Sequence, residues 1–230
     1  IVFLFWTITM LAKKVWMKEG KESPWANKIG VLLAGFVGAV AYTFTESFWF
    51  NAVEGEVYAM SSFFTAVTFW AILKWEQVAD EPKSLRWFVF IAFLVGLSIG
   101  VHLLNLLCVP AIVYVVYFKK WKKTSFWGFV LAGVISVVML WFLNMFLVPQ
   151  VINLAGKMEL FFVNTLGAPF NMGSIVFFAL LVGLIVWGLW YTAKRNKPIW
   201  NTAILSLMFI LIGYSSFFML IIRANTNTPI

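Results

Sequence analysis

Apolar residues follow one another in long runs along this chain, and the charged residues stand almost entirely between these runs. A helix needs about 20 apolar residues to cross a bilayer. The pattern predicts about eight membrane-crossing segments, at residues 1–12, 29–45, 57–74, 87–101, 103–118, 126–148, 172–193 and 199–222. We therefore expect an all-α fold, a polytopic bundle of transmembrane helices that forms a single domain over residues 1–230.

The longest apolar run, at residues 87–118, admits two interpretations. As a single helix it would be about 48 Å long at 1.5 Å per residue, against a hydrocarbon core of about 30 Å. Such a helix would have to tilt strongly. A hairpin of two short helices that turns within the sequence SIGVHLLN fits the bilayer without that tilt.

The basic residues favour the hairpin. They cluster in short loops at residues 13–28, 74–86, 119–123 and 194–197. If residues 87–118 cross the membrane twice, these clusters share one side, and of the 17 basic residues only Lys157 and Arg223 lie on the other. The positive-inside rule makes the basic side cytoplasmic. We therefore expect a short helical hairpin at residues 87–118.

Composition agrees with a membrane protein and excludes several function classes. The chain is 63% hydrophobic and 11% charged, against about a half and a quarter in soluble domains. The net charge of +8 lies in the loop clusters, so we expect no nucleic-acid partner. The sequence contains no P-loop, dinucleotide-binding glycine pattern, HExxH motif or nucleophile elbow. Its single His and single Cys are too few for a zinc site of His and Cys ligands, and we predict no metal ligands.

The polar residues that the topology does not require gather on the opposite, extracytoplasmic side. They are Glu46, Glu54, Glu56, His102, Asn105, Lys157, Glu159 and Arg223. Ionisable groups at membrane depth are costly, and they are candidate functional groups for that reason. Carboxylates can act as a general base or bind a divalent cation, and His and Arg can hold a phosphate. We expect the chemistry on this side.

Helix geometry separates some of these residues and joins others. Glu54 and Glu56 differ by about 200° on a helix and point to opposite faces, so one can serve a site while the other faces water or a helix N-terminus. His102 and Asn105 are three residues apart and would share a helix face.

Two further segments complete this side. Gly96 and Gly100 would let another helix or a ligand approach closely. The loop at 149–171, which mixes Phe and Leu with polar groups, is expected to lie on the membrane surface and to cover a lipid-facing groove.

Three stretches resemble a known family: ESFWFNAVEGEVYAMSSFFTA (46–66), LVGLSIGVHLLNLLCVPA (94–111) and GYSSFFMLIIRANTNTPI (213–230). They are similar to a bacterial family of membrane proteins, long catalogued as a domain of unknown function and related to the protein O-mannosyltransferases of the GT-C superfamily. The resemblance implies a GT-C-like bundle. It also implies that the chain is an internal fragment, with a first span and a catalytic loop upstream of Ile1 and any soluble region downstream.

The function that the resemblance implies is a membrane glycosyltransferase of the protein O-mannosyltransferase type. It would transfer a sugar from a polyprenyl-phosphate-linked donor to hydroxyls of exported proteins, at the extracytoplasmic face of the bacterial inner membrane. In its EVYA-type motif, Glu56 is implied as a secondary catalytic carboxylate, with the main base upstream. His102 in the GxHLL motif and Arg223 in the IRANTNTP motif are implied to contact the donor phosphate or the acceptor.

Asn105, Glu54 and Glu46 complete the expected substrate-binding set. The expected partners are membrane lipids, the lipid-linked sugar donor and the acceptor protein. Beyond that donor we expect no cofactor other than a divalent cation that the carboxylates could bind.

Two other function classes fit the same residues. A transporter or flippase for a lipid-linked or anionic substrate would also use intramembrane Glu, His and Arg, and an inverted repeat, which the sequence lacks, would favour it. A non-catalytic membrane scaffold would use the polar side as a docking surface. Glycans that disappear on gene deletion would distinguish the enzyme from both.

Overall fold

Helices make up all the regular structure in the part of the chain that the computed structural model describes, residues 1–17, 24–54 and 57–226, with side chains described as far as Ser215. The expected all-α helical bundle is confirmed. In chain order the elements are α1 (Val2–Trp16), α2 (Trp25–Thr43), α3 (Glu46–Val53), α4 (Tyr58–Val78), α5 (Arg86–Ile99), the 3-10 helix η1 (Leu103–Leu107), α6 (Cys108–Lys120), α7 (Phe126–Trp141), the π-helix η2 (Phe142–Leu147), α8 (Val148–Asn164), α9 (Met172–Lys194) and α10 (Pro198–Thr226).

Within the described residues, five helical segments are long and apolar enough to cross a membrane, or six if α3 and α4 form one broken span. The five are Trp25–Thr43, Leu103–Lys120, Phe126–Asn164, Met172–Lys194 and Pro198–Ser215. The expected number of about eight is not confirmed. One reason is that α5 has 14 residues, about 21 Å of helix, which is shorter than a hydrocarbon core of about 30 Å.

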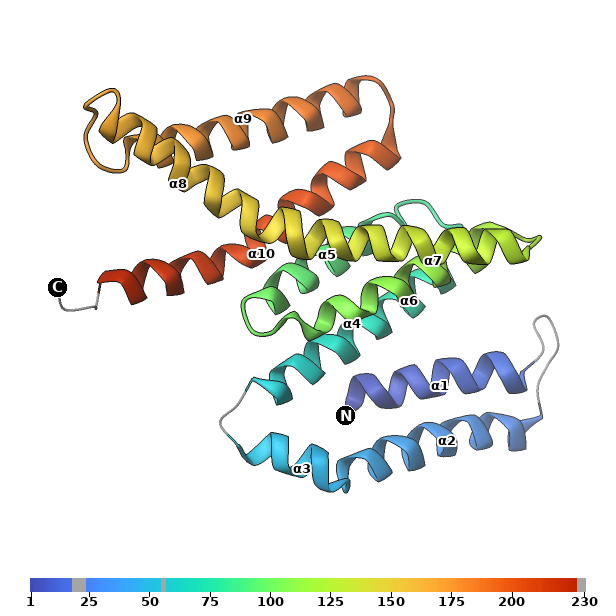
Figure 1. The fold of residues 1–230 in the computed structure, drawn as a ribbon. Helices are drawn as coiled ribbons and strands as arrows, with labels where there is room; N and C mark the ends of the chain where they lie inside the picture. Colours follow the sequence, from blue (N-terminus) through green and yellow to red (C-terminus); the bar gives the residue numbers. More distant parts are fainter. Residues whose placement is uncertain (18–23, 55–56, 227–230) are drawn as a thin grey trace.

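The turns between helices lie at two opposite ends of the molecule (Figure 1). We call one the basic end, which holds the turns at 79–85, 121–125 and 195–197, and the other the histidine end, which holds the turns at 44–45, 100–102 and 165–171. The basic clusters that follow α6 and α9 both belong to the basic end. The side of the membrane that each end faces is taken up below.

The apolar run at 87–118 is broken as expected. Helix α5 ends at Ile99, and His102 has an extended backbone before η1 and α6 begin. The chain reverses direction there (Figure 1). Both α5 and α6 pack against α4, whose buried residues Ala71, Ile72 and Trp75 belong to the central core. The hairpin that the basic residues predicted is therefore confirmed as two helices joined at the histidine end.

Helices α5 and α10 form the most extensive helix pair in the fold. They cross where Gly96 faces Gly213. A Cβ atom at position 96 would lie 2.9 Å from the Ile210 Cα atom, and one at position 213 would lie 2.5 Å from the Leu97 amide nitrogen. Only hydrogen fits at this crossing, so the expected close approach of another helix at Gly96 is confirmed.

The expected surface loop at 149–171 is wrong for most of its length, because residues up to Asn164 are helical. Pro149 lies in the first turn of α8, where a missing amide proton removes no essential hydrogen bond. The π-helix η2 joins α7 to α8, and the three form one 39-residue helical segment. The Tyr214 hydroxyl donates to the Val148 carbonyl (3.1 Å) and fixes α10 against this junction.

Ion pairs connect three helices at the basic end. Lys14 of α1 pairs with Glu76 of α4. After α4, the carboxylate of Asp80 lies 3.0 Å from the Lys119 ammonium and 3.8 Å from that of Lys120. The hydrogen bond and charge of Lys119 hold the pKa of the exposed Asp80 carboxyl below its usual value. These charges are thus engaged with protein partners.

Candidate functional site

His102 lies at the histidine end and caps η1. Its Nδ1 atom accepts a hydrogen bond from the Leu104 amide (3.1 Å). Because Nδ1 is an acceptor here, the neutral ring carries its proton on Nε2. The half-buried ring also lies 5.5 Å, centroid to centroid, from that of Tyr58 at the start of α4. His102 is therefore oriented by its own loop and presents an Nε2–H donor to any ligand.

Asn105 lies in the core, not beside His102. It is fully buried, and its Nδ2 group donates to Ser98 Oγ (3.0 Å) and to Thr68 Oγ1 (3.3 Å). The expectation that His102 and Asn105 share a helix face is wrong, because His102 precedes the helix in an extended conformation. The amide of Asn105 ties η1 to α4 and α5. Contact between Asn105 and a substrate remains a prediction.

Glu46 and Glu54 lie at the two ends of α3, and both are exposed. Glu46 is in the first helical turn, behind the capping residue Thr45, where the helix dipole favours a negative charge. Glu54 follows the last turn, where the dipole disfavours it. Neither forms a salt bridge within the described part of the chain. A structural reason is therefore present for Glu46 and missing for Glu54.

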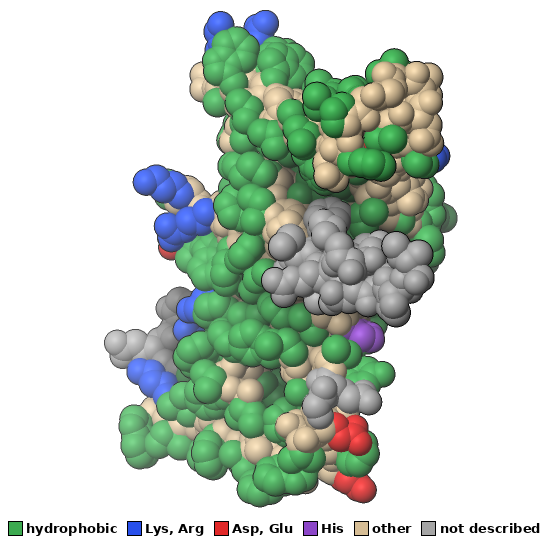
Figure 2. All heavy atoms as spheres, turned by 90° about the vertical axis from the view of Figure 1, so that its left-hand side faces the viewer, with side chains coloured by type: hydrophobic (Ala, Val, Ile, Leu, Met, Phe, Trp, Pro, Cys, Tyr) green, Lys and Arg blue, Asp and Glu red, His purple; other side chains and the backbone are tan. Residues whose placement is uncertain are grey.

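The structure leaves two predicted residues without side-chain geometry. Glu56 lies outside the described residues, and Arg223 belongs to the backbone of α10 beyond the described side chains. Figure 2 shows the histidine end face-on, with the single histidine and acidic side chains on a mainly hydrophobic surface. Among the described residues, no three His, Cys, Asp or Glu side chains are placed to hold a metal ion. Binding of a divalent cation stays a prediction.

Glu159, expected in an extracytoplasmic loop, has a structural position. Its carboxylate accepts hydrogen bonds from the amides of Asn171 (2.5 Å) and Ser174 (2.8 Å) at the start of α9. Gly173 lies against α8, since a Cβ atom there would be 2.5 Å from the Glu159 Cα atom. Glu159 thus caps α9 and closes the α8–α9 hairpin.

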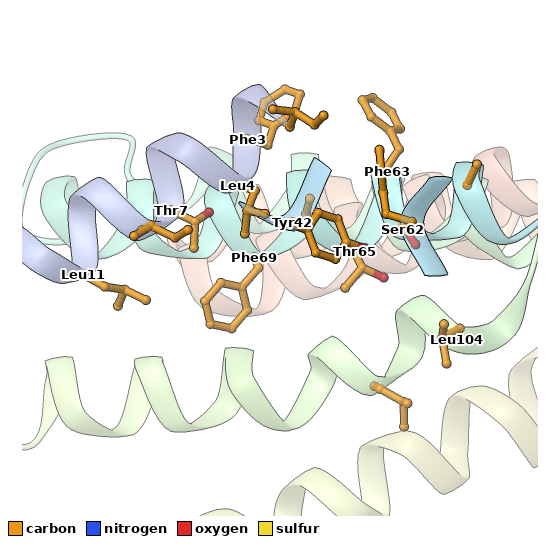
Figure 3. A pocket seen from close by; sticks show the side chains of 16 residues that line it. Phe3, Leu4, Thr7, Leu11, Tyr42, Ser62, Phe63, Thr65, Phe69 and Leu104 are labelled. Carbon is orange, nitrogen blue, oxygen red and sulfur yellow. The ribbon is translucent and has the colours of Figure 1, made fainter. Parts of the chain in front are cut away.

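An apolar cavity of ≈ 770 Å³, which sequence reasoning did not predict, runs between α1 and α4 (Figure 3). We call it the slot. Its walls are Ile1, Phe3, Leu4, Thr7, Ile8 and Leu11 on one side, Ala59, Ser62, Phe63, Thr65, Ala66 and Phe69 on the other, and Tyr42, Phe48, Leu104 and Leu107 from α2, α3 and η1. The runs on α1 and α4 each cover about 15 Å at 1.5 Å per residue. The slot is therefore long and narrow.

The slot and the polar groups share the same elements. Leu104 lines the slot, while its amide donates to His102. Phe48 lines the slot from α3, the helix that carries Glu46 and Glu54 at its ends. An amphipathic molecule can therefore place an apolar chain between α1 and α4 and a polar head near His102.

Comparison with known proteins supplies the family. The model of the protein O-mannosyl-transferase TMEM260 N-terminal domain matches residues 1–125 of the 230, a range that contains two of the three motifs quoted above. No curated protein and no solved structure matches the chain. The match covers more than half of the chain and confirms the expected relation to protein O-mannosyltransferases. The chain belongs to the TMEM260 N-terminal domain family of protein O-mannosyl-transferases.

Proposed function

We propose that this chain is part of a membrane glycosyltransferase of the GT-C type that uses a polyprenyl-phosphate-linked sugar. The sugar goes to a hydroxyl of an exported protein. The observation that carries the proposal is the junction of the slot with the polar groups of the histidine end, where Leu104 contributes to both. A lipid-linked sugar has the two chemical halves that this junction accommodates, and the family match supplies the reaction type.

The proposed reaction is a single group transfer. The oxygen of the acceptor hydroxyl attacks the anomeric carbon of the sugar, and the bond from that carbon to the phosphate oxygen breaks. Polyprenyl phosphate leaves with the electron pair, and a carboxylate takes the hydroxyl proton. Glu56 is the proposed assisting carboxylate of this chain, with the main base before Ile1.

The charge on the departing phosphate needs donors and a cation. The Nε2–H group of His102 is free to donate, because Nδ1 is occupied by the Leu104 amide. Arg223 is the proposed cation, since a guanidinium and a phosphate form strong charge-assisted hydrogen bonds. Such donors stabilise developing charge best when they are held in place beforehand. Glu46, Glu54 and Asn105 are proposed to complete the substrate site.

The proposed orientation follows from charge. The basic end carries the Lys and Arg clusters at 119–123 and 194–197, and the positive-inside rule assigns it to the cytoplasm. The histidine end then faces the extracytoplasmic side, where exported acceptor proteins are present. We propose the inner membrane of a bacterium as the location.

Single variants of the full-length protein test this function. Glu56→Gln, His102→Ala and Arg223→Ala are each expected to lower the rate of glycan transfer to an acceptor by about a hundredfold, the cost of removing one stabilising group. The matched control is Glu81→Gln, an exposed glutamate of the basic end, which should transfer at the normal rate. Undiminished transfer by all three site variants would contradict the proposed site.

A further inference from the structure

We infer that the slot is a binding site for a methyl-branched isoprenoid chain, and that Ala59, Ser62 and Ala66 of α4 select it over a straight chain. This inference rests on the proposed function, because it assigns a place to the chain of the proposed donor. The steps below use only the walls of the slot, its unpaired hydroxyl and its connection to His102.

The α4 wall of the slot has a repeating shape. Ala59, Ser62 and Ala66 recur at spacings of three and four residues, so they lie above one another on one helix face. Each leaves a recess about one helical turn, or about 5.4 Å, from the next. A polyisoprenoid carries a methyl branch on every fourth backbone carbon, a repeat of comparable length. A straight acyl chain has no branches to fill such recesses, and unfilled space forfeits dispersion contacts.

The α1 wall carries a hydroxyl without a partner. Thr7 is 7% exposed, and its Oγ1 atom has no hydrogen-bond partner. Two residues further along the same helix, Thr9 donates to the Phe5 carbonyl (2.7 Å) in the usual manner of a helical threonine. A buried polar atom without a partner calls for an explanation such as a missing ligand. The π electrons of isoprenoid double bonds are weak acceptors for such a donor, and a saturated chain offers none.

Thr65 repeats this observation on the facing helix. Its Oγ1 atom is also enclosed and unpartnered, although its residue lines the slot. Figure 3 shows Leu4, Thr7 and Leu11 in succession along α1, with Ser62 and Thr65 on α4. Lone hydroxyls on both walls of an otherwise apolar cavity indicate a bound molecule of low but not negligible polarity.

Leu104 sets the direction of the bound chain. Its side chain lines the slot and its amide holds His102. A chain that contacts Leu104 therefore ends beside His102. The polar head lies at the histidine end and the chain continues between α1 and α4 toward Leu11 and Phe69.

The test measures binding of a ligand that carries no sugar. Full-length protein in lipid nanodiscs is titrated with polyprenyl phosphate and with a saturated straight-chain alkyl phosphate of equal carbon number. We expect the branched ligand to bind at least about tenfold more tightly, as methyl groups in fitted apolar pockets allow. Ala66→Leu should abolish this preference, and Thr7→Val should reduce it a few-fold. Ala203→Leu, at an exposed alanine of α10, should keep it.

Equal affinities for the two ligands, or a preference that survives Ala66→Leu, would overturn the inference. A second measurement does not depend on any variant folding. Polyprenyl phosphate with a photoreactive group in its chain should label peptides from 1–12 and 57–74 of the natural protein, and labelling confined to other segments would also overturn it. Because neither ligand donates a sugar, loss of the proposed function would appear as absent transfer with binding intact. Failure of this inference would appear as transfer without chain selectivity.

Discussion

The two ends of the molecule treat their charges in opposite ways. At the basic end, Lys14 pairs with Glu76, and Asp80 pairs with Lys119 and Lys120. At the histidine end, the exposed Glu46 and Glu54 make no salt bridge within the described residues, and the Nε2 side of His102 is free. Paired charges connect helices, whereas unpaired ones remain able to meet a ligand. The comparison separates groups that serve the fold from groups that serve a reaction.

The largest expected effect comes from the crossing of α5 and α10, which supports the hairpin of the histidine end. Gly96→Leu would drive a side chain into the backbone of α10 at Ile210. We expect a loss of at least about 3 kcal/mol, since overpacking a fitted contact is costly. The protein should express poorly or melt far below normal in detergent. Gly183→Leu is the control, because nothing lies within 4 Å of a Cβ atom at that glycine.

The next effect separates the two roles of His102. His102→Asp supplies a capping oxygen for the Leu104 amide but removes the Nε2–H donor. We expect transfer to fall by about a hundredfold while the melting temperature changes little. His102→Ala should lose both activity and about 1 kcal/mol of stability, the cost of a missing helix cap. Normal transfer by the aspartate variant would show that the donor is not used.

Asn105 should produce a smaller effect of a different kind. Asn105→Ala removes the amide that joins η1 to Thr68 and Ser98. We expect a loss of about 2 kcal/mol, because a buried polar partner disappears. If Asn105 only positions η1, transfer per folded molecule should fall less than in His102→Asp. A larger fall in transfer, without a lower melting temperature, would instead place Asn105 at the substrate.

The smallest effect belongs to the basic end and depends on pH. The folded-state pKa of Asp80 lies below its usual value of 3.8 because of Lys119. Its ion pair therefore adds stability above that pH, and the contribution disappears as the pH falls through the folded-state pKa. Asp80→Asn should lower the melting temperature slightly at pH 7 and make no difference at pH 2. Transfer activity should not change, and a large loss of activity would break the contrast between the two ends.

Much of the fold was predictable from local pattern. The hairpin at 87–118 followed from the basic clusters, and the close crossing at Gly96 followed from a missing side chain. The number of spans was not predictable, because Pro149 lies where a helix tolerates proline and so does not end the segment at 126–164. The direction of Asn105 also escaped, since it depends on the cap that His102 forms.

The slot could not be predicted in the same way. Its two walls are separated by about fifty positions in sequence, and it exists only because α1 packs beside α4. The spacing of Ala59, Ser62 and Ala66 was a visible signal, but small residues at helical spacing also occur wherever two helices pack. The unpaired hydroxyl of Thr7 distinguishes the two cases, and it is a property of the folded chain.

The π-helix η2 has a consequence for how this family can change length. A π-helical turn holds one more residue than an α-helical turn, so removal of one residue from 142–147 would restore a regular helix. Everything beyond the deletion would then rotate by about 100° relative to α7. Glu159 would turn away from the amides that begin α9. A deletion of one residue would thus detach the α8–α9 hairpin without altering a single contact residue.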